Sequence, residues 1–200
     1  MINSLKILAF FVLGAFLGYN SLLPDFFLKN DFSMPVLYLL MFLVGFGVGS
    51  NKKAFDILKM FNIKFLLIPL AIVTGSGLGG FIMGIFISEV SAKDSMAISF
   101  GFGYYSLSSV IISKIKGETL GVIALLSNIS REIFTLVFTP ILVKIFGKFA
   151  GIASGGATAM DTTLPVIKKY SGEDMVIVAF FSGIILSILV PFLVTFMITI

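Results

Sequence analysis

The stretch TLGVIALLSNISREIFTLVFTPILVKIF, residues 119–146, is mostly apolar and carries the adjacent charges Arg131 and Glu132 near its middle. A helix that crosses a bilayer needs about 20 predominantly apolar residues, and this stretch is longer. A charge at bilayer depth costs at least about 2.5–3.5 kcal/mol on insertion scales, so it persists only where it is paired or faces water. The stretch therefore predicts a transmembrane helix with a polar site near its centre.

A second polar interruption follows in GGATAMDTTLP, residues 155–165, where Asp161 lies in another apolar region. Glycines, hydroxyls and a proline at membrane depth free backbone groups, which must then meet water, protein or ligand. Discontinuous helices of this kind occur near the midplane of transporters, where unwound carbonyls face cations. We predict that Asp161 binds a cation or an amine, with Thr158, Thr162 and Thr163 as hydroxyl ligands. The alternative is an external loop in which Asp161 caps the next helix.

The composition is that of an integral membrane protein, with 58% hydrophobic residues, 12% charged residues and a mean hydropathy of +1.13. A soluble domain carries about 25% charged residues. The apolar runs have helical length and do not alternate as strands do, which predicts a single all-α polytopic transmembrane domain over residues 1–200. The net charge of +4 comes from lysines at loop edges, so no nucleic-acid partner is expected.

The chain contains no cysteine and no histidine. Their absence excludes disulfides, thiolate nucleophiles and histidine-based metal sites, so we expect no enzyme, no cofactor and no metal ion. Serine and zinc intramembrane proteases use histidine, and the Gly-x-Gly-Asp string of the aspartyl type is also missing.

Charge-free runs predict about seven crossings, with discontinuous helices among them and an amphipathic interfacial segment at residues 51–64. The predicted spans are residues 7–23, 32–50, 65–88, 95–113, 119–146, 149–167 and 175–200. Segment 149–167 is ambiguous, because it could cross or re-enter, and cytoplasmic loops carry an excess of Lys and Arg. If it crosses, nine lysines lie on one side and four on the other; if it re-enters, the division is seven against six. The lysines thus favour seven crossings and a cytoplasmic N terminus.

One helix face in residues 119–146 is polar, because Asn128, Glu132, Thr135 and Thr139 recur at helical spacing. Arg131 points about 100° away from Glu132. One arrangement pairs Arg131 with an acid on another helix and leaves Glu132 for a ligand. The alternative is a salt-bridge network that only locks the bundle. We predict that Glu132 binds a proton or an amine, with Arg131 and Asn128 beside it.

The string SFGFGYYSLSS, residues 99–109, is the third polar element. Its glycines weaken a helix, its hydroxyls line it with donors, and tyrosine faces can bind an ammonium group by cation–π attraction. We predict Tyr104, Tyr105 and Ser106 as further pocket residues. An aromatic belt at the membrane interface is the alternative, but these tyrosines lie near the middle of their span.

The three strings together, GFGYYSLS at 101–108, Arg131-Glu132 and GATAMDTTLP at 156–165, resemble the LysO lysine exporter family. The resemblance covers nearly the whole chain and the C-terminal two-thirds of longer members. It implies export of L-lysine, and of toxic lysine analogues, across the cytoplasmic (inner) membrane. It also implies a distant relation to the cation/proton antiporter and anion transporter group, whose cores use broken helices. The family's glutamate after arginine corresponds to Glu132, and its Met-Asp aspartate corresponds to Asp161.

The chain departs from this family pattern in two respects. Ser127-Asn128 stand where family members carry Asn-Asp, so one acid near the site is absent. Longer members also have further N-terminal spans with another membrane-embedded acid. We therefore expect either a homo-oligomer or a small membrane subunit that supplies those spans.

Lysine carries two cationic groups and one carboxylate at neutral pH. Two acids can meet the amines, while a half-helix N terminus or Arg131 meets the carboxylate. Export of a cation works against an inside-negative potential, at about 2.3 kcal/mol per charge per 100 mV. Entering protons carried by Glu132 would supply that drive, which predicts proton antiport. The alternatives are a sodium/proton antiporter or an organic anion carrier of the same architecture, or a half-transporter that needs a partner subunit.

Overall fold

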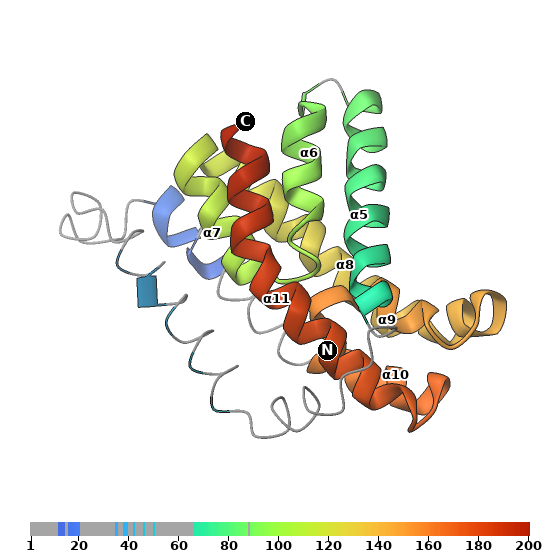
Figure 1. Cartoon of the computed structure of the whole chain (residues 1–200). Coiled ribbons are helices and arrows are strands. Elements are labelled where there is room, and N and C mark those ends of the chain that lie inside the picture. The colour runs from blue at the N-terminus through green and yellow to red at the C-terminus, as the bar shows by residue number, and fades with distance from the viewer. Residues whose placement is uncertain are drawn as a thin grey trace.

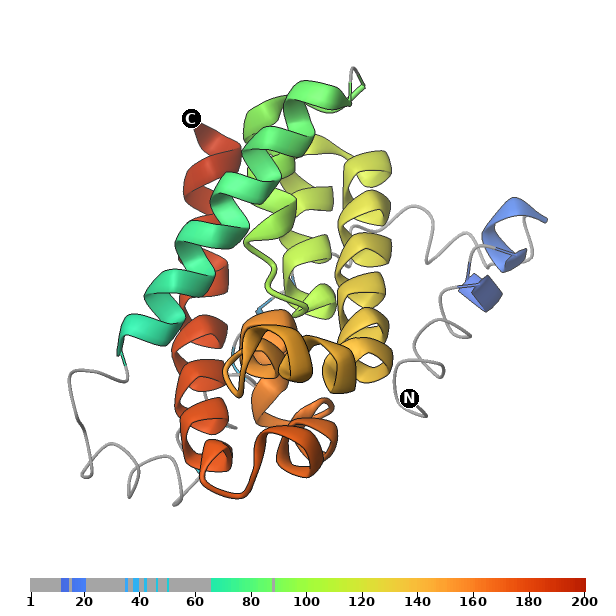
Figure 2. The same ribbon diagram turned by 90° about the vertical axis from the view of Figure 1, so that its right-hand side faces the viewer.

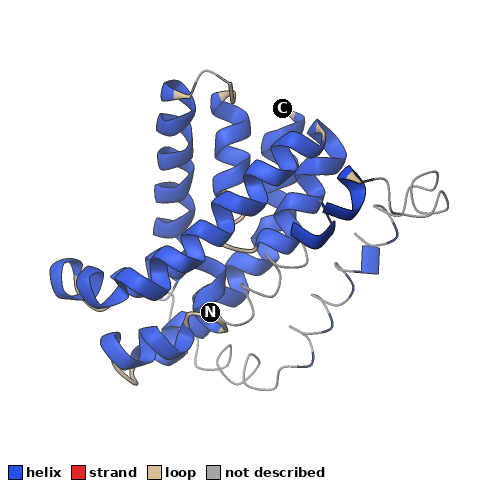
Figure 3. Cartoon of the chain, turned by 180° about the vertical axis from the view of Figure 1, so that it is seen from behind, coloured by secondary structure: helices blue, strands red, loops and turns tan. Residues whose placement is uncertain are grey.

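The computed structural model describes residues 66–87 and 89–200, and in addition residues 12–14, 16–20, 35, 38, 39, 42, 46 and 50 (Figure 1). Among these residues every regular element is a helix and none is a strand (Figure 3). The predicted spans at 7–23 and 32–50 lie largely outside the described residues, and the predicted interfacial segment at 51–64 lies wholly outside them.

Three long helices of the described region form the frame of the bundle: α5 (Leu67–Phe86), α8 (Glu118–Phe146) and α11 (Met175–Thr199). They are the helices there that are long and apolar enough to cross a membrane. At a rise of about 1.5 Å per residue, even α5 is about 30 Å long, which matches the hydrocarbon core. The predicted spans 65–88, 119–146 and 175–200 are confirmed as candidate membrane helices.

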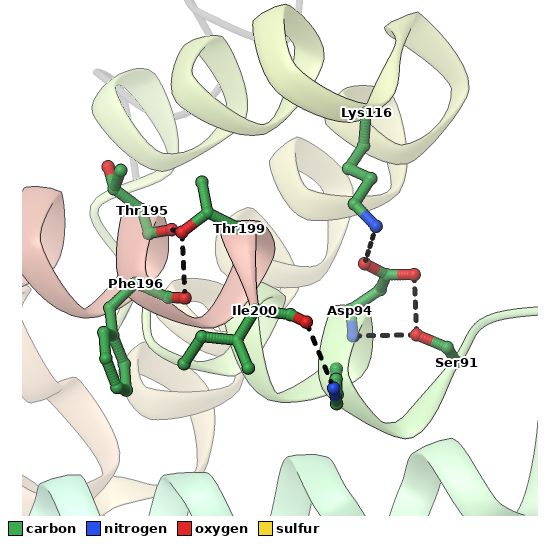
Figure 4. Close-up of polar contacts among 8 residues, drawn as sticks. Ser91, Asp94, Lys116, Thr195, Phe196, Thr199 and Ile200 are labelled. Carbon is green, nitrogen blue, oxygen red and sulfur yellow. Dashed lines mark hydrogen bonds and ion pairs between the residues drawn. The ribbon is translucent and has the colours of Figure 1, made fainter.

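Two shorter helices, α6 (Ala92–Ser99) and α7 (Tyr105–Lys116), form a hairpin that enters and leaves the bundle at one end. We call it hairpin 1. Lys116 Nζ lies 3.4 Å from Asp94 Oδ1, so the start of α6 and the end of α7 are adjacent (Figure 4). Lys93 Nζ donates to the carbonyl oxygen of Ile200 at 3.2 Å, which places the end of α11 there as well. This is the Lys116 end of the bundle.

The prediction that residues 95–113 cross as one span is wrong. The chain reverses at Phe102 and Gly103, which have φ angles of 48° and 89°. Glycine adopts such left-handed conformations readily, whereas a bulky residue does so only where its surroundings hold it. Phe102 is held, because its side chain is fully buried and its ring lies beside that of Phe100.

The second hairpin consists of α9 (Ala150–Gly155), the 3-10 helix η2 (Gly156–Met160) and α10 (Leu164–Ser171). We call it hairpin 2. Its two arms run side by side, since a Cβ built on Gly151 would lie 3.3 Å from Ser171 Oγ. Just beyond the hairpin, Lys148 Nζ pairs with Asp174 Oδ2 at 3.1 Å. This is the Lys148 end of the bundle.

Residues 149–167 thus fold back on themselves and do not run in one direction, which favours the re-entrant alternative over a crossing; the number of crossings stays a prediction. The chain turns at Gly156, whose φ of 62° favours glycine, and a new helix starts with a proline in its first turn. Proline has no amide hydrogen to leave unpaired at that position.

The two hairpins are arranged in opposite directions (Figure 2). Hairpin 1 follows α5 and enters the bundle from the end where α5 finishes. Hairpin 2 follows α8 and enters the bundle from the end where α8 finishes. Inverted arrangements of this type place transporter binding sites near the midplane. Here the tips meet, because the amide of Ala157 donates to the carbonyl oxygen of Phe102 at 2.9 Å.

Close packing positions hairpin 1 against α5. A Cβ on Gly80 would lie 2.5 Å from Ser99 Oγ, and one on Gly84 would lie 2.5 Å from Ala92 Cα. Two small residues four apart allow helix backbones to approach in this way. The largest fully buried side chains of the described region lie chiefly in the hairpins and α11, while α5 is mostly exposed. The hairpin tips are therefore in the interior of the bundle.

Candidate functional site

The polar face of α8 is divided between the two hairpins. Asn128 holds hairpin 1: its Oδ1 accepts a 2.7 Å hydrogen bond from the Gly103 amide, and its Nδ2 donates to Ile98 O at 3.0 Å and Ala124 O at 2.9 Å. Only 2% of Asn128 is exposed. With three hydrogen bonds made inside the protein, this side chain positions the tip of hairpin 1 and does not line the cavity described below.

Arg131 holds hairpin 2 in a similar way. Its guanidinium donates to Ser154 O at 2.9 Å, to Ala153 O at 3.0 Å and to Ser76 Oγ of α5 at 3.1 Å. The two carbonyls belong to the last turn of α9, where the helix dipole favours a positive charge. Thr135 adds a 2.7 Å contact to Ser154 Oγ. Within the described residues the predicted pairing of Arg131 with an acid is wrong, and backbone carbonyls take its place.

Glu132 follows Arg131 on α8 and is fully buried. It faces a cavity of about 120 Å³ where the hairpin tips meet α8 and α11. A volume of this size has room for several water molecules or a small organic solute. The residues that line it are Gly103, Tyr104, Tyr105 and Ser106 from hairpin 1, Ala157, Thr158 and Met160 from hairpin 2, Asp161 and Thr162 from its turn, Glu132 from α8, and Ser187 from α11.

The structure brings together most of the side chains predicted for the site. Glu132 and Asp161 line one cavity with five other predicted residues: Tyr104, Tyr105, Ser106, Thr158 and Thr162. Asn128 and Arg131 do not line it and act as anchors behind it. Ser187 and Met160 were not predicted, because one serine or methionine within an apolar run is ordinary in membrane helices and carries no signal of its own.

The turn of hairpin 2 gives Asp161 a defined setting. Its Oδ1 accepts hydrogen bonds from the amide and the hydroxyl of Thr162, the latter at 3.3 Å. The N-cap residue of α10 is Thr163, and no side chain forms a capping hydrogen bond there. The alternative in which Asp161 caps that helix is therefore wrong. Thr158 Oγ1 donates to Gly155 O at 2.9 Å and lies 3.3 Å from Thr163 Oγ1, which closes the turn.

The cavity has two electrostatically different edges. Glu132 of α8 and Asp161 of hairpin 2 supply carboxylates to it. The first turn of α7 also borders the cavity, and the N-terminal end of a helix carries partial positive charge. An arrangement with two acids and one electropositive edge can bind a molecule that carries amines and a carboxylate.

Comparison with known proteins adds independent findings. The family described as "Lysine exporter LysO" matches residues 8–198 of the chain. The protein "Lysine exporter LysO" of Escherichia coli K12 is 32% identical over 197 residues, which is 98% of this chain and 64% of that protein. The protein "Putative lysine exporter" of Haemophilus influenzae Rd is 33% identical over 192 residues, 96% of each chain. The chain thus spans somewhat less than two thirds of the first relative. No solved structure matches it.

Proposed function

The chain belongs to the lysine exporter LysO family, a family of transporters rather than enzymes, and on that premise we propose that it exports L-lysine from the cytoplasm in exchange for protons. Its apolar helices and its family make it a multi-pass membrane protein. The observation that carries the proposal is the single cavity that Glu132 and Asp161 share at the meeting point of two opposed hairpins.

The chemistry of the cavity suits lysine and related basic amino acids. Two carboxylates can each accept hydrogen bonds from an ammonium group, and such charge-assisted bonds are about twice as strong as neutral ones. Tyr104 and Tyr105 place aromatic rings at the same cavity, and an aromatic face attracts an ammonium ion. A lysine analogue that keeps both amines is expected to bind for the same reasons.

The proposal of proton antiport rests on the place of Glu132, a fully buried carboxyl group at the cavity. A carboxylate can bind either a proton or an ammonium group, but not both at once. Lysine and a proton therefore compete for one group, so that each leaves when the other arrives. An inward proton then offsets the work of moving a cation outward, about 2.3 kcal/mol per charge per 100 mV.

Arg131 argues against the sodium/proton alternative. Carbonyls freed at a helix break are the groups that coordinate sodium in many transporters. Here the carbonyls of Ala153 and Ser154 accept hydrogen bonds from the Arg131 guanidinium. A tethered cation already occupies that position, which favours an exchanger of lysine and protons.

Lysine efflux from proteoliposomes tests the proposal. The purified chain is reconstituted, vesicles are loaded with radiolabelled L-lysine, and an acidic exterior is imposed. We expect lysine efflux to accelerate when the exterior is acidified. Unlabelled leucine inside the vesicles should have no effect on lysine efflux. Sodium-22 uptake without lysine movement would support the antiporter alternative. If neither lysine nor sodium moves although the protein is inserted, we expect that the chain needs a further component. The mass of the purified complex then tests the predicted homo-oligomer, and co-purification of a small membrane protein tests the predicted second subunit.

For the orientation we propose that the Lys148 end faces the cytoplasm. Of the lysines in the long described segments, Lys144, Lys148, Lys168 and Lys169 belong to this end and Lys93, Lys114 and Lys116 to the other. If residues 7–23 and 32–50 each cross once, as predicted, the division over the whole chain becomes nine against four. That excess supports a cytoplasmic Lys148 end and a cytoplasmic N terminus.

Cysteine labelling checks this orientation directly, because the chain has no cysteine of its own. We expect Lys116→Cys to react with a membrane-impermeant maleimide in intact cells. Lys148→Cys should react only after the membrane is permeabilised. Both lysine side chains are exposed and each pairs with one acid, and loss of such a pair at the surface costs about 1 kcal/mol or less, so the fold should tolerate either change. Labelling of Lys148→Cys alone in intact cells would reverse the assignment.

A further inference from the structure

We infer that the cavity binds lysine in one orientation, with its side-chain ammonium at a closed end between Glu132 and Ser187 and its α-carbon at an open side beside Asp161. Ser187 is then a specificity-determining residue, and its ligand class is a primary ammonium on an unbranched chain. The inference deepens the proposed function and rests on it, since it takes the cavity to be the lysine site.

The residues that line the cavity differ in exposure. Glu132 of α8 and Ser187 of α11 are 0% and 1% exposed, so solvent does not reach the part of the cavity that they line. Asp161 is exposed, and Tyr104 and Ser106 are half-buried. We call the part lined by Glu132 and Ser187 the closed end, and the part lined by Asp161, Tyr104 and Ser106 the open side. A cavity of about 120 Å³ brings both parts within reach of one small molecule.

Ser187 is an unsatisfied polar group at the closed end. Its Oγ has no hydrogen-bond partner within the described part of the chain. A buried hydroxyl in that state is unfavourable, and a hydrogen-bonding group of a ligand in the cavity would satisfy it. A serine hydroxyl has two acceptor lone pairs, and an ammonium group carries three N–H donors. An ammonium group that enters the closed end can therefore donate both to Ser187 and to the carboxylate of Glu132.

The charge of the lining favours an ammonium group over a carboxylate at this end. The described residues that line the cavity include two acids, Glu132 and Asp161, and neither lysine nor arginine. Arg131 is engaged behind the cavity, since its guanidinium donates to the carbonyls of Ala153 and Ser154. A ligand carboxylate at the closed end would lie near Glu132, and like charges in a buried site repel each other strongly. A side-chain ammonium there balances the charge of Glu132 instead.

The shape of lysine agrees with this orientation. Its side-chain ammonium ends an unbranched methylene chain, which needs little room at a closed end. The α-carbon is branched and carries an ammonium and a carboxylate, both of which lose hydration if they are buried. At the open side the α-ammonium can pair with Asp161 while the α-carboxylate stays in contact with water. The cavity therefore distinguishes the two ends of the molecule.

Two lysine derivatives test the orientation, because they carry the same charged groups and add bulk at opposite ends. In ε-trimethyl-L-lysine the side-chain ammonium is enlarged and has no N–H donor. In L-lysylglycine the molecule is extended at its carboxylate end. The affinity of the wild-type chain for each compound and for L-lysine is measured from ligand-induced shifts in unfolding temperature.

We expect lysylglycine to bind within about threefold of lysine, and trimethyllysine to bind at least about tenfold more weakly, as for loss of hydrogen bonds to a charged group. The reverse ranking, or equal binding of the two derivatives, would overturn the orientation. Tighter binding of trimethyllysine than of lysine would assign the ammonium head group to the aromatic rings, and it would overturn the orientation as well.

Ser187→Ala, with Ser182→Ala as its matched control, tests the role of Ser187. Ser182 lies on the same helix, is fully buried and likewise lacks a hydrogen-bond partner among the described residues, but it does not line the cavity. We expect Ser187→Ala to weaken the binding of lysine and lysylglycine by the same factor, about tenfold. Trimethyllysine, which has no side-chain N–H to donate to Ser187, should bind as it does to the wild type.

Ser182→Ala should bind all three compounds as the wild type does. Unchanged lysine binding by Ser187→Ala, equal weakening of all three compounds, or the same change in both serine variants would overturn the role of Ser187.

A second pair of compounds separates the inference from the proposed function: 6-aminohexanoate and its trimethylammonium derivative, which both lack the α-ammonium. If the wild type fails to bind lysine but prefers 6-aminohexanoate to its derivative, and Ser187→Ala removes that preference, lysine export is wrong and the ammonium-binding closed end stands. If lysine is bound and exported but the trimethylated compounds bind as tightly as their parents, the inference is wrong and the proposed function stands.

Discussion

Glu132→Gln is expected to abolish proton-driven lysine export while the protein still folds. Glutamine keeps the size of the side chain but can neither carry the negative charge nor bind and release a proton. Removing one partner of a buried charge pair typically costs about 2–5 kcal/mol, which corresponds to roughly 30-fold to several thousand-fold weaker lysine binding. Efflux under an imposed pH gradient and lysine-induced thermal stabilisation should both be lost.

Glu118→Gln is the matched control for this prediction. Glu118 is an exposed acid in the first turn of the same helix, at the Lys116 end. Its replacement should change stability by at most about 1 kcal/mol through the helix dipole and leave export unchanged. The unfolding temperature of each variant separates loss of function from loss of fold. Wild-type efflux by a folded Glu132→Gln protein would contradict the assignment of Glu132 as the proton and amine group.

Gly156→Ala is expected to be among the most destabilising small substitutions in the described part of the chain. Gly156 has a φ of 62°, and a Cβ there would lie 2.6 Å from the carbonyl oxygen of Phe102. The left-handed conformation costs a side-chain-bearing residue about 1–2 kcal/mol. Steric overlap with the backbone of the opposite hairpin adds about 1–3 kcal/mol. It would also strain the neighbouring hydrogen bond from Ala157 to Phe102.

Gly147→Ala separates the two contributions. Gly147 has a φ of 86°, and a Cβ there would meet no atom within 4 Å. We expect this variant to lose only about 1–2 kcal/mol from the conformational term. Thermal unfolding in detergent and lysine efflux measured on both proteins check the prediction. Equal losses of stability in the two variants would show that the overlap with the Phe102 carbonyl adds no cost.

Chemistry at membrane depth made much of the lining of the cavity predictable from sequence. Charges such as Glu132 and Asp161 are so costly in a bilayer that their presence alone indicates a polar cavity. Tyr104 was found in the same way, from a glycine-rich break in an apolar run. The cavity that joins these residues was therefore expected, although the sequence does not give its shape. The role of Arg131 was not predictable, because its acceptors are backbone carbonyls that only the folded hairpin presents.

The hairpins illustrate why lysine counting could not decide the topology. Seven crossings and a topology in which both observed hairpins re-enter give the same division, nine lysines against four, provided that residues 7–23 and 32–50 each cross. In passing from one arrangement to the other, Lys114 and Lys116 exchange sides with Lys144 and Lys148, so the totals stay the same. If only one of the two segments re-enters, the division is seven against six, so a comparison that allows one re-entrant segment favours seven crossings.

The contact between the two hairpin tips joins one peptide group to another, from the Ala157 amide to the Phe102 carbonyl. Every amino acid except proline carries both groups, so most exchanges of side chain leave the bond itself intact. A saturation-mutagenesis map of this junction should therefore show broad tolerance at Ala157 toward small residues and strong depletion of proline. At Gly156 nearly all codons should be depleted. Selection at the junction acts on the path of the chain more than on side-chain chemistry.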